Sequence, residues 1–280
     1  MEFNSKKFQA IRFHDLFNPP DYLDSEGTMI EFVKLVKDLG IYISSDLSFD
    51  QHIRIVTKRG NQMAGWILRV FHSRGRTLMV TLLKQLVHSR MEYCCVLWTP
   101  ITQELISLLE SVQRNFTSKI MFENHPDPLD YWERLKELKL YSLERRRERY
   151  LIIYTWKVIH GLYPNPGILL NTALPVQHLA HPNQGIGITF NDRTGMRVNH
   201  VKESTPPLQK KSILTHCCNI YNAIPVHLRQ LSPTNSTPKI SEFKSQLDAW
   251  LQLLPDQPTI SNRQRAAPTN SILHQRHHRN

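Results

Sequence analysis

Eight cationic side chains stand between Asp50 and Glu92, and no acidic residue lies among them. Because opposite charges four residues apart stabilise a solvated helix, exposed helices normally mix the two signs. An all-positive segment favours a polyanion as its partner, and the phosphates of a nucleic acid are the polyanion expected here. The candidate nucleic-acid-binding residues are Arg54, Lys58, Arg59, Arg69, Arg74, Arg76, Lys84 and Arg90.

The rest of the chain is also basic, so a second interpretation stays open. The 280 residues include 35 Lys and Arg against 24 Asp and Glu, which gives a formal net charge of +11. A basic surface without a specific ligand is the alternative, because many proteins of high pI bind nothing. A second cluster, Arg145 to Arg147, stands between Glu144 and Glu148, which favours a salt-bridged, solvated helix face there.

Sequence motifs of common enzymes are missing. The chain has no Gly-x4-Gly-Lys-Ser/Thr loop, no Gly-x-Ser-x-Gly elbow and no His-Glu-x-x-His motif. Polymerases that use two metal ions hold them with paired aspartates, and no Asp-Asp dipeptide occurs in the sequence. We therefore expect no complete active site, no metal site, no cofactor and no small-molecule substrate in this chain.

Four cysteines form two vicinal pairs, Cys94-Cys95 and Cys217-Cys218. A disulfide between neighbouring residues strains the peptide between them, so we expect reduced thiols in a cytosolic or nuclear protein. The weaker alternative is a zinc site made from His216, Cys217 and Cys218 with a distant fourth ligand, although the usual Cys-x2-4-Cys spacing is missing.

The hydrophobic pattern predicts the elements that must position these side chains. Short apolar runs that alternate with turn residues predict strands in residues 1–49. Apolar residues at helical spacing predict three helices between residues 51 and 122. The predicted buried stripes are Ile53, Val56, Met63, Trp66, Ile67 and Val70, then Leu78, Leu82 and Leu86, then Leu105, Leu108, Val112, Phe116 and Ile120.

Two capping signals predict the next helices. Asp130 and Glu133 have the spacing of a capping box, and Ser142 can cap a longer helix that ends at Gly161. The chain is therefore expected to be α+β and mostly α.

Composition changes in the last third of the chain. Residues 163–212 are rich in proline, which predicts long loops or weak hairpins. Helical patterning returns in residues 213–224 and 240–251. The polar, basic stretch 255–280 is predicted to be a disordered tail.

Short motifs follow one another in a characteristic order. They are Asn4-Ser5-Lys6-Lys7, Leu39-Gly40-Ile41, Met91-Glu92-Tyr93, Trp98-Thr99-Pro100, Tyr131-Trp132-Glu133, and the segments 109–116, 143–147, 221–225 and 243–247. In this order and spacing the chain resembles the C-terminal part of the reverse transcriptase of non-LTR retrotransposons, closest to the jockey-like group.

The resemblance implies a division of the chain. Residues 1–49 would be a palm remnant, and 50–122 a helical thumb that contacts template and primer. Residues 123–254 would be a C-terminal extension, followed by the tail 255–280.

The resemblance also implies roles for a few residues. Leu39, Gly40 and Ile41 would correspond to the primer grip, where a glycine lets the backbone approach the primer closely. Lys7 would match a lysine that lies near the phosphates of the incoming nucleotide. The Asp-Asp motif of the family would lie before Met1, so Mg²⁺ is expected only for the intact polymerase and this chain alone is predicted inactive.

Three functions remain open from the sequence. The first is a truncated reverse transcriptase that still binds an RNA template, an RNA–DNA hybrid or duplex DNA. The second is a chain that complements separately made fingers and palm, and the third is a fold remnant or interaction protein without a nucleic-acid ligand. The N-terminal residues lack the apolar core of a signal peptide, and no apolar run suits a membrane span, so a nuclear or cytoplasmic location is expected.

Overall fold

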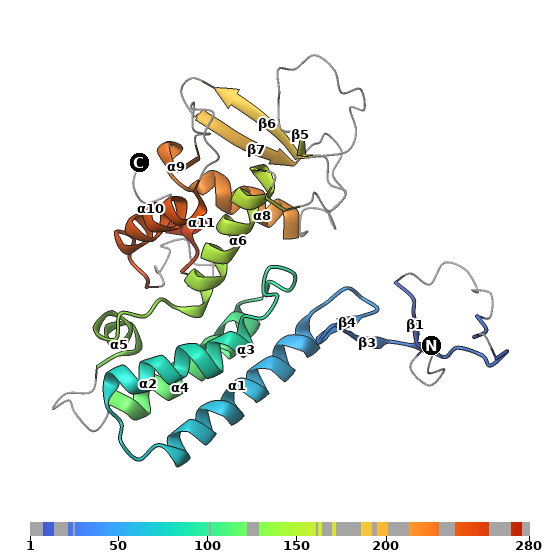
Figure 1. Cartoon of the computed structure of the whole chain (residues 1–280), viewed down its shortest axis with the longest axis horizontal. Helices are drawn as coiled ribbons and strands as arrows, with labels where there is room; N and C mark the ends of the chain where they lie inside the picture. Colours follow the sequence, from blue (N-terminus) through green and yellow to red (C-terminus); the bar gives the residue numbers. More distant parts are fainter. Residues whose placement is uncertain are drawn as a thin grey trace, which may run out of the picture. The chain divides into compact units, whose positions relative to one another are not determined.

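The computed structural model describes residues 8–13, 22–24, 26–100, 102–121, 129–160, 162–163, 170–171, 186–191, 195–200, 213–229, 239–257 and 270–275. The fold is α+β and mostly α, as the sequence predicts (Figure 1). The chain forms two compact units, of which the first contains residues 1–93 and 100–116 and the second contains residues 94–99 and 117–280.

Short strands begin the first unit, as the alternating pattern predicts. Strands β1, Ala10–Ile11, and β2, Phe32–Val33, pair in parallel. Strands β3, Leu35–Asp38, and β4, Ile41–Ser44, form an antiparallel hairpin.

The hairpin turns through two residues, Leu39 and Gly40, because Asp38 pairs with Ile41. Both turn residues have positive φ, 43° at Leu39 and 90° at Gly40. Two-residue hairpins favour such backbone, which suits the twist of the strands and which glycine adopts without strain. The segment predicted to resemble the primer grip is therefore the tip of a tight hairpin.

Three helical segments follow the hairpin, which confirms the helical periodicity (Figure 1). Helix α1 spans Asp50–Val70. The second segment begins as α2, Arg76–Leu82, continues with π-helical geometry as η2, Leu83–His88, and ends as α3, Ser89–Met91. Helix α4 spans Gln103–Met121.

The buried side of these helices differs in part from the predicted stripes. In α1, Ile53, Val56 and Ile67 are buried, but Trp66 and Val70 are 44% and 49% exposed.

In the second segment the predicted register is wrong by one residue. The buried residues there are Met79, Leu83 and Val87, whereas Leu78 is 41% exposed. Apolar residues occupy both i, i+4 series, so periodicity could not decide which series faces the core.

Both predicted capping motifs occur in the second unit. Helix α5, Tyr131–Glu137, begins with a capping box in which the Glu133 N–H donates to Asp130 at 2.8 Å and the Asp130 N–H donates to Glu133 at 2.9 Å. Helix α6, Leu143–Ile159, begins where the Ser142 hydroxyl accepts the N–H of Arg145. Gly161, the predicted end of this helix, lies outside the described residues.

Part of the proline-rich stretch forms the hairpin that the sequence allowed. Strands β6, Ile186–Asn191, and β7, Gly195–His200, are antiparallel, and β5, Leu170–Asn171, pairs with β6 in parallel. Most of the remaining residues of 163–212 lie outside the described part of the chain.

The core of the second unit lies between helices that are distant in sequence. Helices α8, Ile213–Ala223, α9, Val226–Arg229, α10, Ile240–Gln252, and α11, Ile272–Gln275, complete the unit. They bury Ile220, Leu228, Leu247 and Ile272 together with the apolar side of α6. The Trp156 ring of α6 stacks on Phe243 of α10 with centroids 4.8 Å apart.

Two predictions for the second unit are wrong. Arg145 and Arg147 are buried rather than on a solvated face. The guanidinium of Arg145 donates to the carbonyl oxygens of Pro255 and Asn270, so the chain at these two residues covers it. Arg147, about 200° around α6 from Arg145, lies close enough to His216 of α8 for its charge to lower the pKa of that histidine. Residues 255–257 and 270–275 are not a disordered tail, because hydrogen bonds and apolar contacts hold them to the unit. None of the helices that the structure describes is long and apolar enough to cross a membrane.

Candidate nucleic-acid interface

The exposed side of α1 carries three of the predicted cations. Arg54 and Lys58 are one helical turn apart, and Arg69 lies three turns beyond Lys58 on the same side. At about 1.5 Å per residue this stripe extends about 22 Å. We call Arg54, Lys58 and Arg69 the cationic stripe.

A shallow groove runs beside the first half of this stripe. It is lined by Arg54, Thr57, Lys58, Asn61 and Gln62 of α1 and by Leu108 of α4. Its polar side chains are hydrogen-bond donors that can reach phosphate oxygens.

The cationic stripe also contacts a carboxylate, that of Glu104, which the sequence pattern did not predict. Glu104, at the start of α4, lies 2.7 Å from the guanidinium of Arg54, and both side chains are largely exposed. An exposed ion pair contributes about 1 kcal/mol or less, so an incoming phosphate can replace Glu104 at modest cost. Arg54 thus already has an anionic partner in the fold.

Arg59 lies about 100° around α1 from its neighbour Lys58, outside the cationic stripe. Its guanidinium donates to the Tyr42 hydroxyl at 3.5 Å and lies 6.0 Å from the centre of that ring. The ammonium of Lys37 lies 5.8 Å from the same ring. The fold therefore adds Lys37, which sequence analysis missed, to the predicted cations.

His52 fixes Tyr42 against α1. The Nδ1 atom of His52 accepts the backbone N–H of Tyr42 at 3.3 Å. Burial lowers the pKa of His52, and the charge of Arg59 lowers it further. The imidazole is therefore neutral at pH 7, which suits its role as an acceptor.

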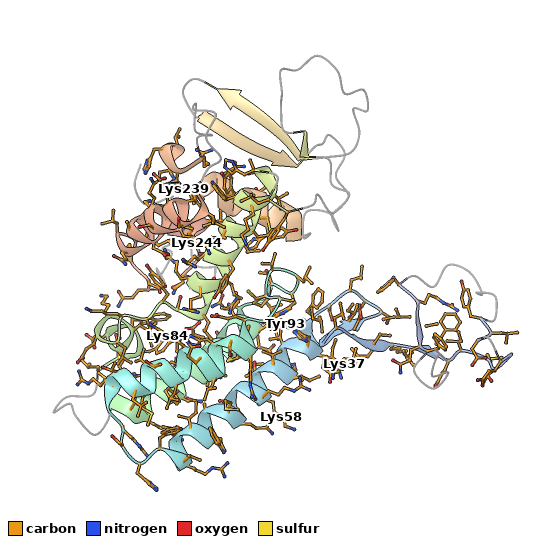
Figure 2. All side chains as sticks on the ribbon, viewed as in Figure 1. Lys37, Lys58, Lys84, Tyr93, Lys239 and Lys244 are labelled. Atoms are coloured by element: carbon orange, nitrogen blue, oxygen red, sulfur yellow. The ribbon has the colours of Figure 1, made fainter. Side chains whose placement is uncertain are left out.

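The other four predicted cations do not join the cationic stripe. Arg74 and Arg76 are half-buried around the start of α2, while Lys84 on η2 and Arg90 at the end of α3 are exposed. Figure 2 shows Lys58 and Lys84 on separate helices.

The tip of the β3–β4 hairpin is held by an aromatic side chain. The Tyr93 hydroxyl donates to the carbonyl oxygen of Leu39 at 3.2 Å, and Tyr93 lies beside the hairpin in Figure 2. Leu39 is 84% exposed, whereas Ile41 is buried. The tip thus presents an apolar side chain and backbone to solvent. Lys7, the other residue expected near a primer, lies outside the described residues.

The cysteines and histidines do not assemble a metal site in the part of the chain that is described. No group of three or more His, Cys, Asp or Glu side chains there is arranged to hold a metal ion. All four cysteines are free thiols, and burial raises the pKa of Cys217 to about 11 and that of Cys218 to about 12. Both thiols are protonated at neutral pH and are poor metal ligands in that form.

Comparisons with known proteins found few similarities to this chain. No protein-family model matches it, and no solved structure matches it. An uncharacterized protein of Caenorhabditis elegans is 23% identical over 133 residues, which are 48% of this chain and 67% of that protein. The chain is thus similar over about half its length to a protein whose name states no activity.

Proposed function

We propose that this chain is the C-terminal part of a non-LTR retrotransposon reverse transcriptase that binds nucleic acid through its helical thumb. The order of motifs from Leu39 to Leu247 supports the family, and three helical segments follow the hairpin where a thumb is expected. The observation that carries the binding function is the cationic stripe on the exposed side of α1. By itself the chain has no polymerase activity.

The stripe binds phosphates rather than bases. Lys58 and Arg69 are exposed, and their long side chains can follow a backbone by charge without reading sequence. An RNA template, an RNA–DNA hybrid and duplex DNA are all ligands of this kind. The proposed location is nuclear or cytoplasmic, where such nucleic acids occur.

Salt dependence of binding tests the proposal. Affinity for an RNA–DNA hybrid is measured by fluorescence anisotropy over a range of salt concentrations. If about four phosphates are neutralised, the log–log slope is near −3 to −4, because each contact releases about 0.9 counterion. Exchanging Lys58 and Arg69 for Gln should flatten the slope by about 2.

The matched control removes two lysines from the second unit. Lys239→Gln with Lys244→Gln changes the net charge equally but alters residues of and next to α10, which belongs to the second unit (Figure 2). Its slope should stay at the wild-type value.

The competing function is an interaction protein without a nucleic-acid ligand, which the Arg54–Glu104 ion pair favours because it neutralises part of the stripe. Absence of binding at low salt, or equal slopes for both double variants, would favour that alternative.

A further inference from the structure

Trp66 is one of the exposed aromatic residues of the first unit. It lies on α1 and is 44% exposed. Its ring meets that of Phe71, the residue after α1, in a T-shaped contact with centroids 6.4 Å apart. The contact restricts the indole ring while leaving close to half of the side chain in water.

The side of α1 that carries Trp66 mixes apolar and cationic residues. Met63 and Val70 are three residues before and four residues after Trp66, and so lie on the same side of the helix. Arg59 lies about two turns before Trp66, and Arg69 three residues after it. Val70 is 49% exposed, so Trp66 is not the only large apolar side chain exposed on this side of α1. We call Arg59, Met63, Trp66, Arg69 and Val70 the aromatic stripe.

Charge decides which partner suits the aromatic stripe. An apolar patch alone would fit another protein, but both charged members here are arginines, and no acidic residue occurs between positions 50 and 92. A flexible polyanion with apolar faces matches both properties, and the unpaired strand of a nucleic acid is such a molecule. In a duplex the base faces are stacked inside the helix and cannot reach the indole.

We propose that the aromatic stripe binds single-stranded nucleic acid, with an unpaired base stacked on Trp66 and the neighbouring phosphates bound by Arg59 and Arg69. This inference rests on the proposed function and specifies its ligand. The cationic stripe holds the backbone of any nucleic acid, whereas the aromatic stripe selects a strand with unpaired bases. A thumb with both surfaces holds a template where single strand meets duplex.

The test compares three variants on two ligands, a single-stranded oligonucleotide of about 12 nucleotides and a hybrid of equal length. Trp66→Ala should weaken single-strand binding about 5- to 100-fold, the range expected for loss of one stacked base. Trp66→Phe should keep most of the affinity because it keeps an aromatic face. Leu78→Ala removes an exposed apolar side chain without an aromatic face and should change the affinity less than about twofold.

Two further readouts separate stacking from other effects. The salt slope of Trp66→Ala should equal that of the wild type, because no charge is lost. Binding to the hybrid should change less than about twofold, and circular dichroism verifies that every variant is folded.

Specific outcomes would overturn the inference. Equal losses for Trp66→Ala and Leu78→Ala would do so, as would equal losses on both ligands. If Trp66→Ala loses affinity only for vesicles of phosphatidylcholine and phosphatidylserine, the aromatic stripe binds a membrane surface instead. Salt-dependent hybrid binding with an unchanged single-strand affinity in Trp66→Ala refutes this inference alone. Failure of the wild type to bind either nucleic acid refutes the proposed function as well.

Discussion

Both carboxylate oxygens of Glu148 lie 3.1 Å from the backbone nitrogen of Ile272, a residue 124 positions later in the chain. The Ser271 hydroxyl donates to the same carboxylate. One turn earlier on α6, the guanidinium of Arg145 donates to the carbonyl oxygens of Pro255 and Asn270 at 3.1 and 3.0 Å. Two buried, opposite charges of α6 therefore hold the last described segment of the chain.

The first prediction concerns the pH dependence of stability. Burial raises the pKa of Glu148 to about 7, although the nearby Arg145 lowers it. Between the ordinary pKa of 4.5 and this value, the folded chain binds more protons than the unfolded chain, so stability falls as pH rises through that window.

Glu148→Gln should remove this dependence, which amounts to at most about 3 kcal/mol. Urea unfolding at several pH values between 4.5 and 8 measures it. The control Glu242→Gln, on the exposed side of α10, should keep the wild-type profile. A Glu148→Gln profile parallel to that of the wild type would disprove the linkage.

The second prediction concerns truncation of the C-terminus. A chain that ends at residue 269 loses Ile272 from the core and leaves the charges of Arg145 and Glu148 with fewer partners. A buried group that loses its hydrogen-bond partner costs about 1–3 kcal/mol, and more when it is charged, so the second unit should melt earlier. A chain that ends at residue 275 keeps these contacts and should melt like the full chain. Thermal unfolding compares the three chains, and equal midpoints would show that the segment contributes nothing.

The third prediction uses two glycines of α1. A methyl group at Gly60 would lie 2.6 Å from the sulfur of Met91 and 3.4 Å from Val112, both buried. Overpacking of this kind costs about 1–3 kcal/mol, which exceeds the gain of about 1 kcal/mol in helix propensity. At Gly65 the same methyl group meets no atom within 4 Å.

Gly60→Ala should therefore destabilise the first unit, whereas Gly65→Ala should stabilise it by about 0.5–1 kcal/mol. Urea unfolding measures both changes. The close approach of α1 to α3 and α4 would be refuted if the two substitutions had the same sign.

The fourth prediction concerns thiol reactivity. Cys94 is exposed, whereas Cys95, Cys217 and Cys218 are buried. Burial raises the pKa of Cys217 and Cys218 and so removes the reactive thiolate near neutral pH. Brief treatment of the native chain with iodoacetamide at pH 8 should label Cys94 first, as peptide mass spectrometry detects. Early labelling of the pair at 217 and 218 would contradict the packing of α8.

The fifth prediction concerns catalysis. The chain contains no paired aspartates to hold the metal ions of phosphoryl transfer. Purified chain with template-primer, deoxynucleotides and Mg²⁺ or Mn²⁺ should therefore incorporate no nucleotide above a blank reaction. Template-dependent extension that copurifies with the chain would refute this expectation.

The sequence by itself predicted the local features of this protein, namely its helix caps and helical segments. The capping box at Asp130, the cap at Ser142 and the three helical segments after residue 50 depend on contacts within a few positions, so spacing alone predicted them. The acid-free segment is likewise a property of residue order.

Tertiary structure alone decided which side of each helix is buried and which distant residues it contacts. Leu78 and Met79 both belong to apolar series, and only tertiary packing placed Met79 in the core and left Leu78 exposed. Glu104 reaches Arg54 from another helix, which no pattern within α1 contains. Glu148 holds Ile272 from 124 positions away, although both segments look solvent-exposed by composition. Burial and charge pairing depend on contacts between segments that are distant in sequence. A linear pattern of charges and apolar residues does not predict those contacts.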